Sequence, residues 1–227
     1  MTALILQARL DSSRLPGKSL LPLGGEPLIF RVMKSLNFIN CDIKILACPK
    51  ECMSSFDALA KKAGFEIFGG PKDDVLARFC LAIKRFKPDR IIRATGDNPF
   101  VFIDAAKTLN KETAEQNADY GLYTEIPHGT GVECVLSEAL LSADIEAQSP
   151  YDREHVCPYL YNNPKKFKLY LPQAPLKWQG KDINCSVDTK ADYLRAAVLY
   201  DLLSDSSHIN GYRGEDIIRT YKDQFCL

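Results

Sequence analysis

Apolar and polar positions along the first half of the chain alternate between short strands and amphipathic helices. Short apolar runs predict buried strands, and apolar residues spaced three or four apart predict helices that pack by one face. The predicted strands are residues 2–8, 43–47, 65–68 and 89–94. The predicted helices are residues 27 to about 38, 53–63 and 73–86. This alternating order favours a mostly parallel sheet covered by helices on both faces.

The second half of the chain has a less regular pattern. Its predicted strands are residues 120–124, 132–136, 167–171 and 183–187. Its predicted helices are residues 137 to about 147, 151–161, 191–203 and 214–221. Because no linker, repeat or low-complexity tract divides the chain, we expect its 227 residues to form one α/β domain.

Composition narrows the class of protein. The 29 basic and 29 acidic residues cancel, so no overall field favours a nucleic acid or an anionic membrane. The apolar start, Met1 to Leu6, is shorter than the apolar region expected of a signal peptide, and no apolar stretch approaches the length of about 18 residues that spans a bilayer. We therefore expect a cytoplasmic protein without a nucleic-acid or membrane partner. In that compartment its eight cysteines are expected to be buried thiols.

The loop after the first predicted strand is the strongest chemical signal. It contains the cations Arg9, Arg14 and Lys18 and the small residues Ser12, Ser13 and Gly17. A bound triphosphate needs cations to offset its charge and backbone N–H groups to hold it in one pose. The alternative is a solvated surface loop that turns at Pro16-Gly17. Composition alone does not decide between the two.

Two common phosphate-binding designs do not fit this loop. The segment Gly17-Lys18-Ser19 resembles the end of a P-loop, but Ser12 stands where that pattern requires its first glycine. The glycine-rich fingerprint of dinucleotide-binding folds does not follow the first strand either. A phosphate site in this loop must therefore follow another design.

Two carboxylates follow apolar runs that predict strands. Asp97 lies in Gly96-Asp97-Asn98-Pro99, and Asp188 follows Val187. Ligands of parallel sheets bind beyond the carboxyl ends of the strands, where Mg²⁺ finds the oxygen ligands it prefers. As alternatives, Asp97 makes a simple turn and Asp188 caps a helix.

Taken together, these segments resemble the cytidylyltransferase superfamily that makes CMP-activated sugar acids, particularly its spore coat polysaccharide biosynthesis protein F branch. The resemblance spans about residues 2–193 in the family's order. Its motifs are Ala8 to Lys18, Gly25 to Leu28, Asp73 to Arg78, Gly96 to Pro99, Pro127 to Gly129, Arg153 to Val156 and Val187 to Thr189. The resemblance implies a three-layer α/β/α, nucleotide-diphospho-sugar transferase-like (Rossmann-like) fold with a mostly parallel central sheet.

The resemblance also implies a set of site residues. Those on the nucleotide side are Ala8, Arg9, Ser12, Ser13, Arg14, Lys18 and, near the cytosine, Arg78. Those on the sugar side are His128, Arg153, Glu154 and His155. For the last three, a capping or core role remains an alternative. Asp97 and Asp188 are the implied Mg²⁺ ligands, and Arg9, Arg14, Lys18 and Asp97 the implied catalytic residues.

The implied reaction is attack by a sugar hydroxyl on the α-phosphorus of CTP, with release of pyrophosphate and Mg²⁺ as cofactor. The expected partners are CTP, a sugar or sugar acid of surface polysaccharide or glycoconjugate synthesis, and a second copy of the chain. Residues 1–227 would form one nucleotidyltransferase domain with a dimerisation or sugar-side insertion around 120–170. Alternatives are a uridylyl or thymidylyl transferase, a glycosyltransferase, or a non-catalytic nucleotide-binding relative.

Four positions depart from the family's pattern. Asp11 replaces a small or neutral residue, and a carboxylate beside a triphosphate is unfavourable unless it turns away or joins the metal ligands. Gly131 stands where an aspartate is common, and His128 and Asn184 replace arginines. Three of these changes fall in the second half of the chain, so they leave the identity of the sugar open.

Overall fold

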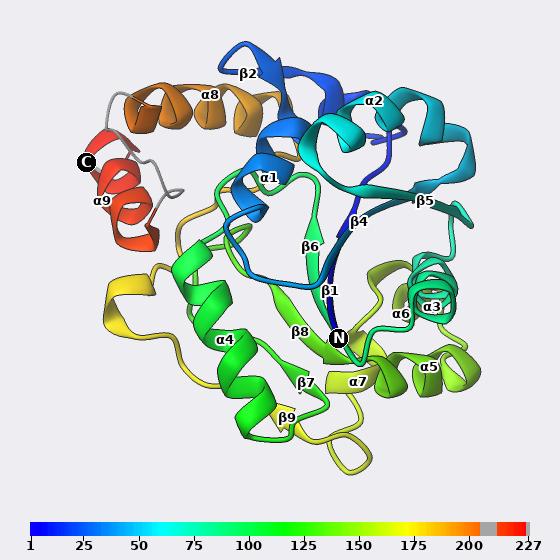
Figure 1. Ribbon diagram of the computed structural model, residues 1–227. Coiled ribbons are helices and arrows are strands. Elements are labelled where there is room, and N and C mark those ends of the chain that lie inside the picture. Colours follow the sequence, from blue (N-terminus) through cyan, green and yellow to red (C-terminus); the bar gives the residue numbers. More distant parts are fainter. Residues whose placement is uncertain (205–212, 226–227) are drawn as a thin grey trace.

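The computed structural model describes residues 1–204 and 213–225, which include a seven-stranded sheet with the strand order β5-β4-β1-β6-β8-β7-β9 (Figure 1). The strands are β1 (Thr2–Gln7), β4 (Ile43–Pro49), β5 (Glu66–Gly70), β6 (Arg90–Thr95), β7 (Tyr120–Gly121), β8 (Glu133–Leu136) and β9 (Leu169–Tyr170). Only β8 runs antiparallel to its neighbours, β6 and β7. A separate two-stranded ribbon consists of β2 (Pro22–Leu23) and β3 (Glu26–Pro27).

The central strand β1 is buried on both faces. Its side chains alternate between two apolar cores, with Leu4 and Leu6 in one and Ala3 and Ile5 in the other, and all four are fully buried. A parallel strand covered on both sides needs apolar residues at every position. This explains why the strand reads as a continuous apolar run in the sequence.

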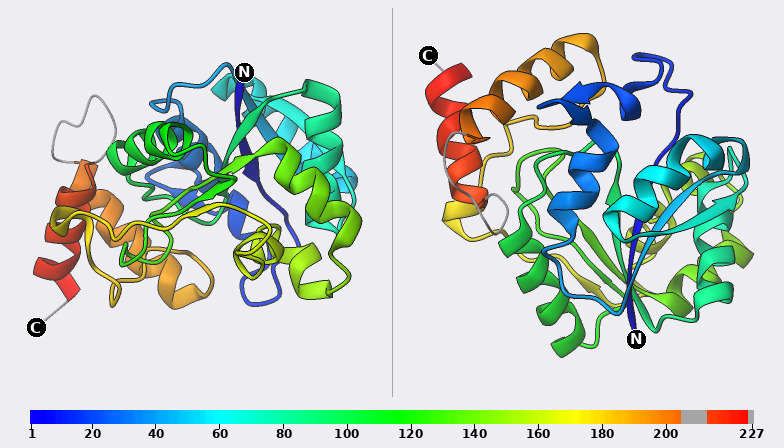
Figure 2. Two further views of the ribbon diagram at one scale, coloured as in Figure 1. Left: turned by 90° about the horizontal axis from the view of Figure 1, so that it is seen from below. Right: turned by 45° about the horizontal axis from the view of Figure 1, so that its top comes forward.

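Helices cover the two faces of the sheet. One face carries α1 (Leu28–Leu36), α2 (Met53–Ala63), α4 (Ile103–Glu115), α8 (Lys190–Ser204) and α9 (Gly214–Phe225). The other carries α3 (Val75–Phe86), α5 (Ser137–Glu146), α6 (Pro150–His155) and α7 (Pro158–Tyr161). Figure 2 shows α9, in red, and α5, in yellow-green, on opposite sides of the molecule in both views. The predicted three-layer α/β/α fold with a mostly parallel sheet is confirmed.

Helix ends in the first half follow local chemistry. Helix α2 ends at Gly64, whose φ of 75° lies in the left-handed region that glycine adopts without strain, as predicted. Helix α3 begins at Val75 rather than at residue 73, because the Asp74 side chain caps it by accepting a hydrogen bond from the Ala77 N–H at 2.9 Å.

The second half departs from the predicted elements. The helix predicted over 151–161 is interrupted at Val156, which has a φ of 76°, so α6 and α7 are separate. The strand predicted over 183–187 is wrong. This segment forms only one isolated bridge, between Asn184 and His128, because its other backbone groups bond to loops.

One α-helix was not predicted at all. Helix α4 buries Ile103, Ala105, Ala106 and Leu109 in its first half, whereas its second half, apart from Thr113, is polar or partly exposed. This distribution gives little periodic signal, since the apolar residues do not recur along the whole helix.

Residues 120–170 belong to the main fold. They supply β7, β8 and β9 to the sheet and α5, α6 and α7 to one face. Three short 3-10 helices complete the elements: η1 (Lys18–Leu20), η2 (Lys50–Cys52) and η3 (Leu176–Trp178). Within residues 1–204 and 213–225, no helix is long and apolar enough to span a membrane. The seven cysteines of the described residues are free thiols, and Cys226 lies outside them.

Candidate active site

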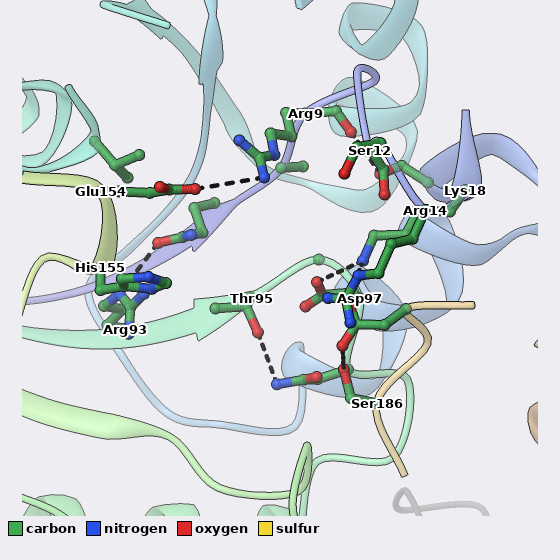
Figure 3. A pocket seen from close by; sticks show the side chains of 18 of the residues that line it. Arg9, Ser12, Arg14, Lys18, Arg93, Thr95, Asp97, Glu154, His155 and Ser186 are labelled. Carbon is green, nitrogen blue, oxygen red and sulfur yellow. Dashed lines mark hydrogen bonds and ion pairs between the residues drawn. The ribbon is translucent and has the colours of Figure 1, made fainter. Parts of the chain in front are cut away.

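The loop after β1, the end of β6 and the segment before α8 surround a cavity of about 470 Å³ (Figure 3). Because β1 and β6 are parallel neighbours, their carboxyl ends bring distant segments to one edge of the sheet. The predicted residues that line the cavity are Ala8, Arg9, Ser12, Ser13, Arg14, Lys18, Arg78, Asp97, His128, Glu154, His155 and Asp188.

The loop after β1 is closed by its own hydrogen bonds. The Gly17 N–H donates to the Leu10 carbonyl at 2.9 Å, and the Ser19 hydroxyl donates to the Arg9 carbonyl at 2.9 Å. Gly17 has a φ of 69°, which lets the chain turn into η1 immediately before Lys18. The loop is therefore held together by its own hydrogen bonds and does turn at Pro16-Gly17, while Asp11, Ser13, Arg14 and Pro16 are exposed.

Lys18 lies at the centre of the site. Its Nζ donates to Asp97 Oδ2 at 2.8 Å, to Asp188 Oδ1 at 2.9 Å and to the Val187 carbonyl at 2.8 Å. Lys18 is only 7% exposed, so these three oxygens, rather than water, stabilise its positive charge. One buried ammonium group thus joins the loop after β1 to two segments that lie 79 and 170 residues further along the chain.

Asp97 is positioned by close backbone packing. The Gly96 N–H donates to the Gln7 carbonyl at 2.8 Å, and the Val187 N–H donates to the Asp97 carbonyl at 2.9 Å. A Cβ on Gly96 would come within 2.7 Å of Ile29 Cδ1 and 3.0 Å of the Gln7 oxygen. Only glycine allows this approach of β6 to β1, which fixes the backbone that carries Asp97.

Two arginines lie at the rim of the cavity. An Nη of Arg14 is 2.9 Å from Asp188 Oδ1, and an Nη of Arg9 is 3.6 Å from Glu154 Oε1. The Arg14 side chain is 64% exposed and the Arg9 side chain is 47% exposed. Neither guanidinium is buried, so both can contact an anionic ligand in the cavity. With Lys18, they give the loop after β1 three cations that face one cavity.

Comparison with known proteins identifies the family of the chain. The cytidylyltransferase family model matches residues 3–206 of the chain. The chain belongs to the cytidylyltransferase family. The spore coat polysaccharide biosynthesis protein SpsF of Bacillus subtilis is 35% identical over 204 residues, which cover 86% of this chain and 85% of that protein. This cytidylyltransferase is therefore a nucleotidyltransferase that transfers CMP from CTP, as predicted.

More distant relatives share the fold. A 3-deoxy-manno-octulosonate cytidylyltransferase of Coxiella burnetii is 26% identical, over 78% of this chain and 65% of that protein. Among solved structures, a cytidylyltransferase from Leptospira borgpetersenii has a TM-score of 0.89 at 24% identity, covering 98% of this chain and 94% of that one. A CMP:2-keto-3-deoxy-manno-octonic acid synthetase complexed with CTP has a TM-score of 0.66 at 15% identity, covering 90% and 98%.

The cap of α8 lies beside Asp188 in this cytidylyltransferase. Asp192 Oδ2 accepts hydrogen bonds at 2.8 Å from both the Thr189 N–H and the Thr189 hydroxyl, and the Asp192 N–H donates back to that hydroxyl at 3.2 Å. This reciprocal arrangement is a capping box. Thr189 therefore caps the helix, and the alternative that Asp188 does so is wrong. The carboxylate of Asp188 remains directed at Lys18 and Arg14.

Replacing Asp192 with asparagine is expected to lower the free energy of unfolding at pH 7 by about 1 kcal/mol. Burial opposes ionisation of Asp192, but hydrogen bonds from Thr189 and Asp188 and the charge of Arg195 outweigh it, so the pKa lies below its usual value. Because the pKa of Asp192 is lower in the folded than in the unfolded state, its ionised carboxylate stabilises the folded protein above the unfolded-state pKa of about 3.9. This contribution to the free energy of unfolding is lost as the pH falls through the folded-state pKa. Urea unfolding at pH 7 and pH 3 measures the difference. The exposed Asp201→Asn on the same helix should change neither value, and an equal loss at both pH values would contradict the assignment.

Asp11 turns away from the cavity. Its carboxylate lies 2.8 Å from Lys72 Nζ, and the hydrogen bond from Lys72 outweighs burial and lowers the pKa of Asp11. Among the described residues, Asp11 is not one of those that line the cavity. The carboxylate inside the predicted triphosphate loop therefore does not face the ligand space.

Arg78 lines the cavity and is only 2% exposed. Its guanidinium donates to the carbonyls of Pro71 at 2.9 Å and Lys72 at 2.8 Å, and burial lowers its pKa. A Cβ on Gly70 would lie 2.6 Å from Arg78 Cγ, so this wall of the cavity is tightly packed. The proximity of Arg78 to cytosine stays a prediction.

Arg153 departs from its predicted place on the sugar side. Its guanidinium donates to Asp74 Oδ2 at 2.9 Å from Nε and to Asp144 Oδ1 at 2.8 Å from Nη2. It does not line the cavity, because these two carboxylates draw it towards α3 and α5. In this cytidylyltransferase Arg153 joins α6 to its neighbouring helices, which corresponds to the structural alternative.

Replacing Arg153 with methionine should lower the free energy of unfolding by about 1–3 kcal/mol, because it leaves two partly buried carboxylates without their charged donor. Affinity for CTP should stay the same. Chemical denaturation and CTP titration test both expectations. Arg219→Met is the matched control, since Arg219 is 68% exposed and its ion pair with Asp216 lies at the surface. A variant of Arg153 that keeps its stability but loses CTP binding would contradict the structural role.

The remaining predicted positions divide between the cavity and its supports. His128, Glu154 and His155 line the cavity, and the His155 ring lies 4.3 Å from that of Tyr151. Asn184 instead accepts a hydrogen bond from the Ser186 N–H at 3.0 Å, which shapes the turn before Asp188. Gly131 lies in a separate small apolar pocket.

Sequence reasoning missed Arg93 and Gln7, which also line the cavity. Arg93 Nε donates to Gln7 Oε1 at 3.1 Å, and an Nη of Arg93 pairs with Glu133. One signal for Arg93 was available in the sequence. It is a charged residue within an apolar run that predicts a buried strand, and burying a charge without a partner is costly.

Proposed function

We propose that the enzyme uses Mg²⁺ to transfer CMP from CTP to a hydroxyl of a sugar or sugar acid in surface polysaccharide or glycoconjugate synthesis. The observation that carries this proposal is the convergence of Lys18, Asp97 and Asp188 in a cavity rimmed by Arg9 and Arg14. Two relatives support the pathway and the acceptor. One is named for spore coat polysaccharide biosynthesis and the other as a 3-deoxy-manno-octulosonate cytidylyltransferase.

The donor set supports Mg²⁺ as the cofactor. Asp97 and Asp188 each place an oxygen within hydrogen-bonding distance of the same Lys18 nitrogen and both line the cavity, so the two carboxylates face the same ligand space. No group of three or more His, Cys, Asp or Glu side chains in the described part of the chain forms a metal site. Two carboxylates leave ligand positions for phosphate oxygens and water, the arrangement that Mg²⁺ prefers. When bound, the ion would neutralise phosphate charge.

The residues of the chain then account for the transfer. Arg9, Arg14 and Lys18 offset the negative charge that develops on the departing pyrophosphate. The acceptor oxygen forms a bond to the α-phosphorus as the bond from that phosphorus to the pyrophosphate oxygen breaks, and the hydroxyl proton passes to solvent water. Positioning and charge neutralisation supply most of the rate in such reactions. No side chain is assigned as the general base.

Pyrophosphate release tests the proposal. The enzyme is incubated with each nucleoside triphosphate and Mg²⁺ against a panel of sugars and sugar acids. We expect release with CTP, dependent on both the acceptor and Mg²⁺. Preference for UTP or dTTP would favour the alternative nucleotide-sugar transferases. CTP binding without turnover on any acceptor would favour a non-catalytic relative.

We also propose that the enzyme is a homodimer that associates through residues 120–170. Ile145 and Tyr151 within this range are 79% and 57% exposed, although both side chains are apolar in large part. Sedimentation of the wild type and of Ile145→Glu tests the proposal. A monomeric wild type would reject it.

A further inference from the structure

We infer that Gln7 selects CTP over UTP by donating a hydrogen bond from its side-chain amide to N3 of cytosine. N3 of cytosine accepts a hydrogen bond, whereas N3 of uracil carries a hydrogen and donates. A side-chain nitrogen that can only donate therefore distinguishes the two bases at this atom. Gln7 is thereby the residue that determines the nucleotide specificity of the proposed function, on which its assignment rests.

The side-chain amide of Gln7 has its orientation set by Arg93. The Arg93 Nε donates to Gln7 Oε1 at 3.1 Å. Because a guanidinium nitrogen can donate but not accept, the Gln7 atom beside it must be the oxygen. The two N–H groups of Nε2 have no hydrogen-bond partner among the residues the structure describes, and Gln7 lines the cavity. The groups of this amide that remain for a ligand are therefore donors.

Arg93 is itself held in place. Arg93 in β6 lies directly opposite Glu133 in β8, and their side chains form an ion pair. Glu133 also accepts a hydrogen bond from the Tyr120 hydroxyl at 2.6 Å. The Arg93 and Glu133 side chains are only 12% and 16% exposed, so water competes weakly for these interactions. Turning the Gln7 amide over would break a charge-assisted hydrogen bond to a fixed guanidinium, so its donors stay available.

The side of the cavity that contains Gln7 suits a nucleobase. Alternate side chains of β1 point to opposite faces of the sheet, so Gln7 follows Ile5 on the face covered by α3. Val75, the first residue of α3, packs in the same core as Ile5 and also lines the cavity. Of the described residues that line the cavity, Val75 and Ala8 alone have apolar side chains. Apolar surface beside a fixed donor matches a base, which is bound by its flat faces and read along its edge.

The backbone of Gln7 connects this side of the cavity to the phosphate-binding residues. Gln7 immediately precedes the loop after β1, and its carbonyl accepts a hydrogen bond from the Gly96 N–H at 2.8 Å, next to Asp97. Figure 3 shows Arg93, the partner of the Gln7 side chain, apart from Lys18 and Asp97. A nucleotide with its triphosphate at Lys18 therefore has its base directed towards a separate group of side chains, which includes Gln7.

Three nucleotides that differ along the edge of the base test the wild-type enzyme. They are CTP, UTP and 3-deaza-CTP, in which a C–H group replaces N3 of cytosine. Titration calorimetry with Mg²⁺ and without any acceptor measures the dissociation constants. We expect UTP and 3-deaza-CTP to bind at least about tenfold more weakly than CTP, because the Gln7 donor is then left without an acceptor. Binding of either analogue as tightly as CTP would overturn the assignment.

Two substitutions then test whether Gln7 is the donor. Gln7→Leu removes the donor at similar size, so the variant should lose the preference for CTP over 3-deaza-CTP. Gln7→Glu replaces the donor with an acceptor, so the ratio of the UTP to the CTP dissociation constant should fall at least about tenfold. The added charge repels both triphosphates alike, and the ratio therefore reports on the base alone. Unchanged nucleotide preferences in these variants, shown to be folded by circular dichroism, would overturn the role of Gln7.

Gln116→Glu is the matched control, because it makes the same chemical change at an exposed position after α4. It should change neither dissociation constant, and an equal shift in this control would reject the explanation. If a Gln7 variant does not fold, 3-deaza-CTP binding to the wild type still tests the contact at N3. Nucleotide selection that depends on Gln7, without turnover on any acceptor, would reject the proposed transfer and leave the role of Gln7 standing. Turnover with CTP that is indifferent to Gln7 would do the reverse.

Discussion

Replacing Lys18 with methionine is expected to lower kcat/KM for CTP by about 10²–10³-fold or more. Methionine retains much of the length of the side chain but removes the ammonium group that bonds to Asp97, Asp188 and the Val187 carbonyl. Two partly buried carboxylates then face each other without their shared cation. The variant therefore loses a cation that neutralises the triphosphate. It also loses the hydrogen bonds that connect the loop after β1 to the segments containing Asp97 and Asp188.

Pyrophosphate release over a range of CTP concentrations measures this effect, with circular dichroism to show that the variant is folded. Lys72→Met is the matched control, because Lys72 is about half exposed and pairs with Asp11 outside the cavity. The control should retain normal turnover. Near-normal activity of Lys18→Met would reject the assigned site.

Replacing Asp97 or Asp188 with asparagine should lower kcat by about 10²–10³-fold and raise the Mg²⁺ concentration needed for half-maximal activity. Asparagine has nearly the same shape but lacks the charge that would attract the cation. Each variant also leaves Lys18 with one anionic partner in place of two. The loss should therefore be partly recovered by high Mg²⁺ only if that carboxylate binds the metal.

Asp11→Asn is the matched control for these variants. Asp11 belongs to the same loop as Lys18, yet its carboxylate pairs with Lys72 and does not face the cavity. Its replacement should change neither kcat nor the Mg²⁺ requirement. A Mg²⁺ dependence that is unchanged in both Asp97→Asn and Asp188→Asn would contradict metal binding by these residues.

Much of this site could be predicted from the sequence because it depends on strand ends. Lys18 and Asp97 both follow buried parallel strands, so the sheet brings them together whatever the details of packing. Asp188 was predicted for the same reason, although the segment before it is not a strand. That segment reaches the edge of the sheet through loop hydrogen bonds, including the one from the Val187 N–H to the Asp97 carbonyl.

The residues that were missed or misplaced depend on tertiary pairing. Arg93 faces the cavity because β8 provides Glu133 opposite it, and the antiparallel direction of β8 has no local signature in the sequence. Arg153 was assigned to the sugar because of its motif. Its carboxylate partners on α3 and α5 become visible only once these helices pack against α6.

The bridge formed by Lys18 also bears on how the enzyme is made. Its three acceptors lie 79, 169 and 170 residues further along the chain. Contacts of such high sequence separation form late in folding, since the loop between them must first be closed. During synthesis the amino-terminal strands can pair before Asp188 leaves the ribosome, but the cavity cannot assemble. Nascent chains should therefore fold their first sheet strands well before they can bind nucleotide.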